Sequence, residues 1–252
     1  MKYSTLIFDL DGTLAPSKDK PSESMCKILC EALKYFKIAV ISGASFEQFQ
    51  SQLVAHLPCT DFSNLMLAPT NGSAIYSFTN GKWNCLEKSI LNKDDKEKIF
   101  IAIKNTMEKF GIKEDNTFGQ QIDDRKTQIT FSGCGRTAPI SVKKTWDPDA
   151  SLRIKMANSI KEQISEFEVR VGGMTSIDVT AKGFDKESAI YKIEKYFNIK
   201  TEEILFMGDA LFEGGNDEPA KKTGVDTLQV KSPEETEEKI KELILSAIPK
   251  EV

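Results

Sequence analysis

The chain has 252 residues, of which 40% are hydrophobic and 29% are charged, a composition typical of a soluble globular protein of one or two domains and not of a disordered one. With 34 Lys and Arg against 38 Asp and Glu, its net charge is −4. We therefore expect no general affinity for nucleic acid or for anionic membranes.

The first third of the sequence alternates short apolar runs with helical patterns. Residues 4–8 and 37–41 are apolar runs that predict buried parallel strands. Apolar residues at helical spacing follow the first run, and Ser45 with Gln48 forms a capping box that predicts the start of a second helix. The order strand, helix, strand, helix favours a parallel sheet covered by helices on both faces.

The middle of the chain has a different pattern. One long helix is predicted over residues 94–110 and a second over residues 149–166. Residues 127–132, 168–171 and 176–180 alternate like strands with one solvated face. Helices combined with antiparallel strands are typical of a separate α+β domain.

The strand and helix pattern of the first third resumes near the C-terminus. A helix is expected over residues 186–197, strands over 204–207 and 227–230, and a last helix after the capping box that begins at Ser232. We therefore predict an α/β protein: a Rossmann-like parallel-sheet core with helices on both faces, interrupted by an inserted α+β cap domain. The expected limits are residues 1–80 and 184–252 for the core and 81–183 for the cap.

The cysteines and the single histidine restrict the chemistry. The five cysteines are scattered without a CxxC pair, so we expect reduced thiols in a cytoplasmic protein. His56 is the only histidine, which argues against His-based zinc sites and Ser-His-Asp hydrolysis. No apolar stretch approaches the ~20 residues that span a membrane, and the apolar N-terminal run is too short for a signal peptide.

Acidic, hydroxyl and lysine side chains stand where predicted strands end and helices begin. Asp9 and Asp11 follow the first strand in Asp-Leu-Asp-Gly-Thr, and Asp209 follows a later strand. Because the carboxyl ends of parallel strands meet at one sheet edge, we expect an oxygen-rich site for Mg²⁺ there. Ser42 precedes a helix N-terminus and suits a phosphate oxygen, and Lys186 begins the helix after the insertion. Each residue alone could be a helix cap or a solvated charge, but their joint order favours function.

These motifs resemble those of the haloacid dehalogenase-like superfamily of phosphoryl-transfer enzymes, in which a large insertion after the second motif forms the cap of subfamily IIB. The resemblance extends to the eukaryotic-type phosphomannomutase branch. Ser42-Gly43-Ala44-Ser45 is similar to its GGSD-like motif, and Gly183-Phe184-Asp185-Lys186 is similar to its Gly-Trp-Asp-Lys motif. Residues 208–217 resemble its long fourth motif.

The resemblance implies roles for individual residues. Asp9 would be the nucleophile that forms an aspartyl-phosphate, Asp11 the general acid and base, and Lys186 a third catalytic residue. Asn216 and Asp217 would orient Lys186 or contact the metal through water. The implied ligands of the cofactor Mg²⁺ are Asp9, Asp11 (through its main-chain carbonyl) and Asp209. The implied phosphate- and substrate-binding residues are Ser42, Gly43, Arg125, Arg136, Ser176, Asp178 and Asn216.

The sequence alone favours a Mg²⁺-dependent phosphohydrolase of small phosphorylated metabolites such as sugar phosphates. The alternative is a phosphomannomutase, which interconverts mannose 1-phosphate and mannose 6-phosphate; a further arginine of that branch falls near Lys143 or Lys144 and is not matched. A non-catalytic binding module is a third hypothesis. The expected partner is a small phosphorylated metabolite and neither a nucleic acid nor a membrane, and the protein is expected to be a monomer or a cap-mediated homodimer.

Overall fold

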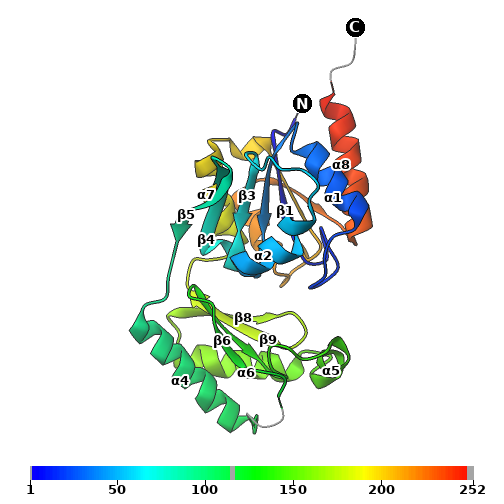
Figure 1. The fold of residues 1–252 in the computed structure, drawn as a ribbon. Coiled ribbons are helices and arrows are strands. Elements are labelled where there is room, and N and C mark those ends of the chain that lie inside the picture. Colours follow the sequence, from blue (N-terminus) through cyan, green and yellow to red (C-terminus); the bar gives the residue numbers. More distant parts are fainter. Residues whose placement is uncertain (1, 114–116, 249–252) are drawn as a thin grey trace. The chain divides into compact units, whose positions relative to one another are not determined.

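The computed structural model describes residues 2–113 and 117–248. The chain divides into two compact units, a core of Met1–Lys88 with Asp185–Val252 and a cap of Ser89–Phe184. The chain thus leaves the core once and returns to it once, as expected for an inserted domain (Figure 1). Among the described residues, no helix combines the length and the apolar character needed to cross a lipid bilayer.

A seven-stranded sheet forms the centre of the core. Its strands are β1 (Thr5–Asp9), β2 (Lys37–Ile41), β3 (Leu65–Ala68), β4 (Ala74–Thr79), β5 (Lys82–Lys88), β10 (Ile204–Gly208) and β11 (Asp226–Gln229). Their order is β11-β10-β1-β2-β3-β4-β5. The strands from β11 to β3 are parallel, whereas β4 and β5 form an antiparallel hairpin at one edge. The central strands are continuous apolar runs because both of their faces are covered.

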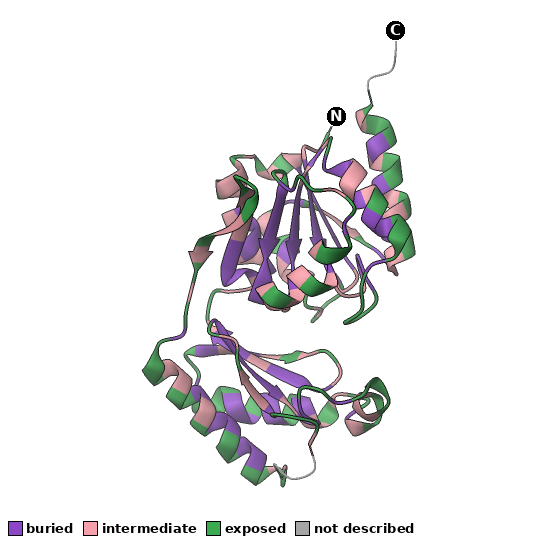
Figure 2. Ribbon diagram, in the orientation of Figure 1, coloured by how far each residue is buried: buried purple, intermediate pink, exposed green. Residues whose placement is uncertain are grey.

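Helices cover both faces of this sheet (Figure 2). They are α1 (Glu23–Ala32), α2 (Phe46–Gln52), η1 (Val54–His56), α3 (Pro69–Gly72), α7 (Lys186–Phe197), η2 (Thr201–Glu203), η3 (Glu218–Thr223) and α8 (Pro233–Ala247). α1, α2 and α8 pack on the face that carries Phe8 and Val40. α7 and η3 pack on the opposite face, which carries Ile7 and Phe206. This confirms the predicted α/β layering of the core.

The cap is an α+β unit with its own antiparallel sheet, in the order β6-β7-β9-β8. Its elements are α4 (Lys93–Lys109), β6 (Ile122–Asp124), β7 (Gln128–Ser132), α5 (Ile140–Trp146), α6 (Ser151–Gln163), β8 (Phe167–Gly172) and β9 (Ser176–Ala181). Phe131 and Ile177 lie on the face that packs against α4 and α6. The alternate residues are polar, and Thr130 lies opposite Asp178 across β7 and β9. One face of the cap sheet is therefore apolar and the other polar, as the alternating pattern predicted.

The structure contains elements that the sequence patterns did not predict, among them β3, β4, β5, β6 and α5. Residues 82–88, expected in the cap, form β5 and pair with β4 in the core sheet, where Trp83 packs against the ring of Phe78. The helix expected over residues 149–166 is shorter and starts at Ser151. It starts there because the Asp147 carboxylate accepts hydrogen bonds from the main-chain N–H groups of Leu152 and Arg153, which satisfies the free donors of the first helical turn.

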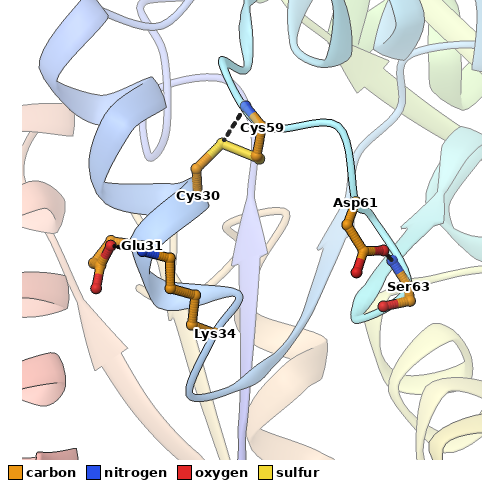
Figure 3. Close-up of a disulfide and its surroundings, with 6 residues drawn as sticks. All are labelled: Cys30, Glu31, Lys34, Cys59, Asp61 and Ser63. Atoms are coloured by element: carbon orange, nitrogen blue, oxygen red, sulfur yellow. Dashed lines mark hydrogen bonds and ion pairs between the residues drawn. A yellow bond between two sulfur atoms is a disulfide. The ribbon is translucent and has the colours of Figure 1, made fainter.

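The expectation of reduced thiols is wrong for two cysteines. Cys30 and Cys59 form a disulfide that joins α1 to the segment before β3 (Figure 3). Their Cα atoms lie 5.7 Å apart although 29 positions separate them in the sequence. That distance is typical of a disulfide, and only the folded chain creates it. Cys26, Cys85 and Cys134 are free thiols, as expected.

Candidate active site

The carboxyl ends of the central strands bring the predicted core residues to one edge of the sheet. Asp9 is the last residue of β1, Ser42 follows β2, and Asp209 follows β10. Lys186 is the first residue of α7, and its Nζ donates a hydrogen bond to Asp9 Oδ1 at 2.5 Å. The parallel topology thus places these side chains from distant sequence motifs at the sheet edge where ligands of such folds bind.

Asp9 is buried and lies close to several charged side chains. It is only 3% exposed. Burial raises the pKa of Asp9 to about 7; Lys186 opposes this shift, and the charges of Asp217 and Asp209 add to it. A neighbouring cation favours the ionised form of a carboxyl group. The position therefore suits a carboxylate that functions next to a bound cation.

Lys186 is completely buried between two carboxylates. Its Nζ contacts Asp9 and Asp217 and lies 5.7 Å from the centre of the Phe206 ring. Burial lowers the pKa of Lys186, but the two carboxylates outweigh burial and hold this pKa above its ordinary value. The side chain is therefore an ammonium group that can bind anionic oxygens.

Asp217 fixes the position of that ammonium group. It is completely buried; its Oδ1 contacts Lys186 Nζ, and its Oδ2 accepts a hydrogen bond from Ala210 N at 2.9 Å. A Cβ atom at position 208 would collide with the Asp217 carboxylate, so the site requires Gly208. Of the two roles expected for Asp217, this geometry favours the orientation of Lys186.

Asp9, Asp209 and Asp217 form an acidic cluster in which one oxygen of each lies within 4.8 Å of the others. Burial and the charge of Asp217 raise the pKa of Asp209. Since both oxygens of Asp217 already have partners, Asp9 and Asp209 are the carboxylates free to bind a cation. Buried carboxylate oxygens are ligands that Mg²⁺ prefers, so the donor set fits this ion.

The Asp209 carboxylate can approach the chain at residue 12 only because that residue is glycine. The φ of Gly12, +93°, lies in a region that side chains with a Cβ rarely adopt, and a Cβ there would lie 2.5 Å from Asp209 Oδ2. Glycine at this position therefore permits both the turn after Asp11 and the close approach of the Asp209 carboxylate.

A strained turn supports the loop that carries Ser42 and Gly43. Thr70 N donates to Ala44 O at 2.9 Å, and Asn71 N donates to Ser42 O at 2.9 Å. Thr70 and Asn71 have φ angles of 48° and 54°, in the left-handed region that is costly for non-glycine residues. Ser42 is buried, and its Oγ accepts a hydrogen bond from Ala44 N. The turn therefore holds the Ser42 loop in one conformation.

The Asp11 carboxylate has its own set of partners. Its Oδ1 accepts hydrogen bonds from Lys18 N at 2.7 Å and from Gln52 Nε2 at 3.0 Å. Gln52 was not predicted as a site residue, because nothing in the spacing of the motifs connects the end of α2 with Asp11. The only sequence feature that pointed to Gln52 is that it is a polar residue in the last turn of a helix that begins directly after a motif.

Two of the predicted cap residues lie on the polar face of the cap sheet. Ser176 and Asp178 are both on β9, two positions apart, and therefore share a face. Ser176 Oγ donates to Gly172 O at 2.8 Å, and Asp178 Oδ1 accepts from Thr130 Oγ1 at 2.8 Å. These contacts hold both side chains in place.

The two predicted cap arginines share a carboxylate partner. Arg125 Nε lies 3.2 Å from Asp123 Oδ2, and an Arg136 guanidinium nitrogen lies 3.6 Å from Asp123 Oδ1. Asp123 was not predicted as a site residue, although its place two positions before Arg125 suggested a local ion pair. Asn216, by contrast, is exposed beside the buried Asp217. Within the described residues it makes no contact with Lys186 that could give it the role implied for it.

The comparison with known sequences points to one family. A model of the family described as eukaryotic phosphomannomutase matches residues 25–246. A phosphomannomutase from spinach is 27% identical over 254 residues, which cover 95% of each chain. A phosphomannomutase from Saccharomyces cerevisiae is 27% identical over 227 residues, which cover 86% of this chain and 84% of the yeast protein.

Solved structures share the fold. A C-terminally truncated IMP-nucleotidase from Plasmodium falciparum has a TM-score of 0.73 and 18% identity, with 98% of this chain and 72% of that chain covered. A haloacid dehalogenase-like hydrolase from Bacteroides thetaiotaomicron has a TM-score of 0.66 and 15% identity, with 96% and 100% covered. At these identities the likeness extends to the fold alone.

Proposed function

The chain belongs to the eukaryotic phosphomannomutase family of the haloacid dehalogenase-like superfamily and is an enzyme of that family, and on this basis we propose that it interconverts mannose 1-phosphate and mannose 6-phosphate with Mg²⁺ as cofactor. The observation that carries the proposal is the buried group of Asp9, Lys186 and Asp217 within a chain whose family match extends across core and cap. The phosphohydrolase favoured by the sequence analysis becomes the second candidate.

The first half of the reaction would use Asp9 as the nucleophile. Its Oδ1 is bonded to Lys186, so Oδ2 would attack phosphorus and form an aspartyl-phosphate as the bond between phosphorus and the sugar oxygen breaks. Asp11 would give its proton to that leaving oxygen. The Lys186 ammonium and the loop of Ser42 and Gly43 would bind the phosphoryl oxygens, over which the charge of the transition state is spread.

Mg²⁺ bound by Asp9, Asp209 and the main-chain carbonyl of Asp11 would offset the negative charge of the phosphoryl group. The acidic cluster supports this assignment, since it brings carboxylate oxygens of Asp9 and Asp209 within 4.8 Å of one another. Asp217 would remain the partner of Lys186.

The aspartyl-phosphate would first form from a sugar bisphosphate, which leaves as a monophosphate. In the second half this phosphoryl group would pass to the free hydroxyl of bound mannose 1-phosphate, with Asp11 accepting that hydroxyl's proton, and the resulting bisphosphate would then return its other phosphoryl group to Asp9. Arg125 and Arg136 would bind the phosphate that the sugar retains, because a guanidinium group binds phosphate oxygens in pairs. Ser176 and Asp178 would hydrogen-bond to sugar hydroxyls. A mutase must retain the doubly phosphorylated sugar long enough for the sugar to reorient within the site.

Lys143 favours the phosphohydrolase as a second candidate. The family resemblance places an arginine near this position. A lysine binds phosphate as a point charge, whereas an arginine can form a bidentate pair of hydrogen bonds with it. Weaker retention of the second phosphate would let water take the place of the sugar hydroxyl. Either reaction acts on a small phosphorylated sugar, and we expect a cytoplasmic location.

The two candidates give different products. The purified chain is incubated with Mg²⁺ and mannose 1-phosphate, with and without catalytic glucose 1,6-bisphosphate, and mannose 6-phosphate and free phosphate are both measured. Mannose 6-phosphate that depends on the bisphosphate supports the mutase, and free phosphate as the main product supports the phosphohydrolase. If wild type forms neither mannose 6-phosphate nor free phosphate, and Asp9→Asn also forms neither, both candidate functions are contradicted.

A further inference from the structure

Gln52 connects the carboxylate of Asp11 with the end of α2. It is the last residue of that helix, and its Nε2 donates to Asp11 Oδ1 at 3.0 Å and to Asp19 O at 2.8 Å. Since a carboxylate and a carbonyl can only accept hydrogen bonds, the side chain must present its NH₂ group to both, and this group has two N–H bonds to give. The orientation of the amide is therefore fixed by its partners.

The chain after Asp11 folds back so that a main-chain donor reaches the same oxygen. Lys18 N donates to Asp11 Oδ1 at 2.7 Å, and Lys18 has a φ of 60°, in the left-handed region. Such a conformation is unfavourable for a residue other than glycine, and it persists where surrounding contacts hold it. The bond from Gln52 to the carbonyl of Asp19, the next residue, is one such contact.

Both hydrogen bonds from N–H groups end on the same oxygen of Asp11. Within the described residues Oδ2 has no hydrogen bond, so Oδ2 is the oxygen that can carry a proton. An oxygen that already accepts two N–H groups has its lone pairs occupied and is not available to a substrate oxygen. The arrangement therefore selects Oδ2 for proton exchange and fixes the direction in which it points.

We propose that Gln52 is a positioning residue for the acid and base function of Asp11. The proposal rests on the role proposed for Asp11 above. Asp11 Oδ2 gives its proton to the sugar oxygen as the bond to phosphorus breaks, and in the second half Oδ2 takes the proton of the incoming hydroxyl. Gln52 does not touch the substrate. It holds Oδ1 so that Oδ2 is presented to the reacting oxygen in both directions.

α2 gives this contact a second consequence. The helix starts at the capping box of Ser45 and Gln48, directly after the loop that carries Ser42, and it ends at Gln52. One short helix thus connects the loop proposed to bind the phosphoryl oxygens with the carboxylate proposed to move the proton. Their relative placement is set within seven residues of helix, from Phe46 to Gln52.

The test compares substrates whose leaving groups need protonation to different extents. Gln52→Glu keeps the shape of the side chain and replaces the donor by an acceptor, and Gln52→Leu removes the polar group without adding charge. Ser51→Ala, at an exposed neighbouring position of α2, is the control for disturbance of the helix. For each, kcat/KM is measured with mannose 1-phosphate and with 4-nitrophenyl phosphate, whose leaving group departs without a proton.

We expect both Gln52 variants to lower kcat/KM for mannose 1-phosphate by roughly 10-fold, through kcat and not KM, because general acid catalysis contributes about 100-fold or more. For 4-nitrophenyl phosphate we expect a loss below about 3-fold. In the Asp11→Asn background, Gln52→Leu should cause no further loss. Ser51→Ala should match wild type, and thermal unfolding should confirm that all variants fold.

Other results would overturn the proposal in distinguishable ways. An equal loss with both substrates, or an equal loss with and without Asp11, would show that Gln52 only stabilises the loop. Wild-type rates in both Gln52 variants would show that it does nothing for Asp11. A wild-type enzyme that is inactive on both substrates, or active with Asp11→Asn on mannose 1-phosphate, would instead remove the proposed function and the inference with it.

Discussion

The side chains of Lys186 and Asp217 are completely buried and in direct contact, although 31 positions separate them in the sequence. The second oxygen of Asp217 is bonded to Ala210 N, so its carboxylate cannot rotate away. The Lys186 ammonium therefore contacts a second carboxylate besides Asp9, and the position of that carboxylate is itself fixed by a hydrogen bond. The negative charge of Asp217 is therefore part of what keeps a cation in a site without access to water.

Asp217→Asn should lower activity by about 100-fold and should reduce stability by about 3 kcal/mol, because it removes one partner of a buried ion pair and leaves the ammonium less compensated. Turnover and thermal unfolding measure the two effects. Glu213→Gln, at an exposed position in the preceding loop, is the control and should resemble wild type. An unchanged turnover in Asp217→Asn would mean that Asp9 alone suffices to position Lys186.

Gly12→Ala should weaken the response to Mg²⁺, since its Cβ would lie 2.5 Å from Asp209 Oδ2. We expect the Mg²⁺ concentration for half-maximal activity to rise by about 10-fold or more, because the collision would displace the Asp209 carboxylate; a 10-fold rise corresponds to about 1.4 kcal/mol of binding free energy. Gly81→Ala is a matched control: Gly81 also has a positive φ, +73°, but a Cβ there meets nothing within 4 Å. An equal effect of both variants would attribute the loss to backbone strain and not to the metal site.

Lys143→Arg should raise the ratio of mannose 6-phosphate to free phosphate, because a guanidinium group retains a phosphate through paired hydrogen bonds. We expect a change of roughly 3- to 10-fold, the worth of about one additional hydrogen bond. Lys143 is half-buried, whereas Lys144 beside it is exposed, so Lys144→Arg serves as the control. A larger change from Lys144→Arg would move the proposed phosphate contact by one residue.

The Asp147 and Arg153 pair makes the cap sensitive to acid. Burial raises the pKa of Asp147, but hydrogen bonds from the side chain and main chain of Arg153 and from Leu152 N outweigh burial and hold it below its ordinary value of 3.8. A carboxyl whose pKa is lower in the folded than in the unfolded protein contributes stability above the unfolded value. That contribution is lost as the pH falls below about 4 and through the folded pKa.

Asp147→Asn should therefore destabilise the cap by about 3 kcal/mol at pH 7 and should flatten the loss of stability below pH 4. Thermal unfolding between pH 2.5 and 7 follows both effects. Arg153 also donates to Gly172 O and Gly173 O, at 3.1 Å and 2.5 Å, so the variant should loosen the turn between β8 and β9. Glu162→Gln, exposed on α6, is the control. An equally steep acid transition in Asp147→Asn would contradict the assignment.

The disulfide between Cys30 and Cys59 should stabilise the core by about 3 kcal/mol, because it closes a loop of 29 residues in the unfolded chain. Addition of dithiothreitol should lower the melting temperature of wild type. The Cys30→Ser, Cys59→Ser double variant should melt at the lower temperature with or without reductant, and Cys85→Ser, which replaces an exposed free thiol, should behave like wild type. A melting temperature of wild type that does not respond to reductant would mean that the bond is absent in solution.

The core was predictable from sequence because local patterns and global topology agree there. The apolar runs at β1, β2 and β10 identify buried parallel strands, and such strands must place the residues after them at one edge. Asp9, Asp209 and Lys186 could therefore be grouped before any coordinates were known, although their catalytic roles remain predictions. The family, first recognised from these motifs, is the one that the sequence comparisons support.

Contacts that depend on how loops fold back were not predictable. Gln52 contacts Asp11 and the carbonyl of Asp19 where the chain folds back through the left-handed Lys18, and no sequence pattern specifies that conformation at a lysine. The sequence suggested a local ion pair of Arg125, but it did not indicate that Arg136 shares the Asp123 carboxylate, because β6 has only three residues and is too short to show the period of a strand. The disulfide could not be predicted either, because the distance between Cys30 and Cys59 depends on how α1 and the segment before β3 pack in the folded chain.

The division of the core into two sequence segments has a consequence for biosynthesis. β1 pairs with β2 on one side and with β10 on the other, and β10 follows the entire cap in the chain. During synthesis, the first segment of the core therefore emerges with one edge of β1 unpaired. Asp9 lacks its neighbours Lys186, Asp209 and Asp217 until the cap and the second segment have been synthesised. Such an open edge can pair with other chains, so this stage is when a nascent chain most needs protection from aggregation. The nucleophile gains its chemical surroundings only when the last quarter of the protein closes the sheet.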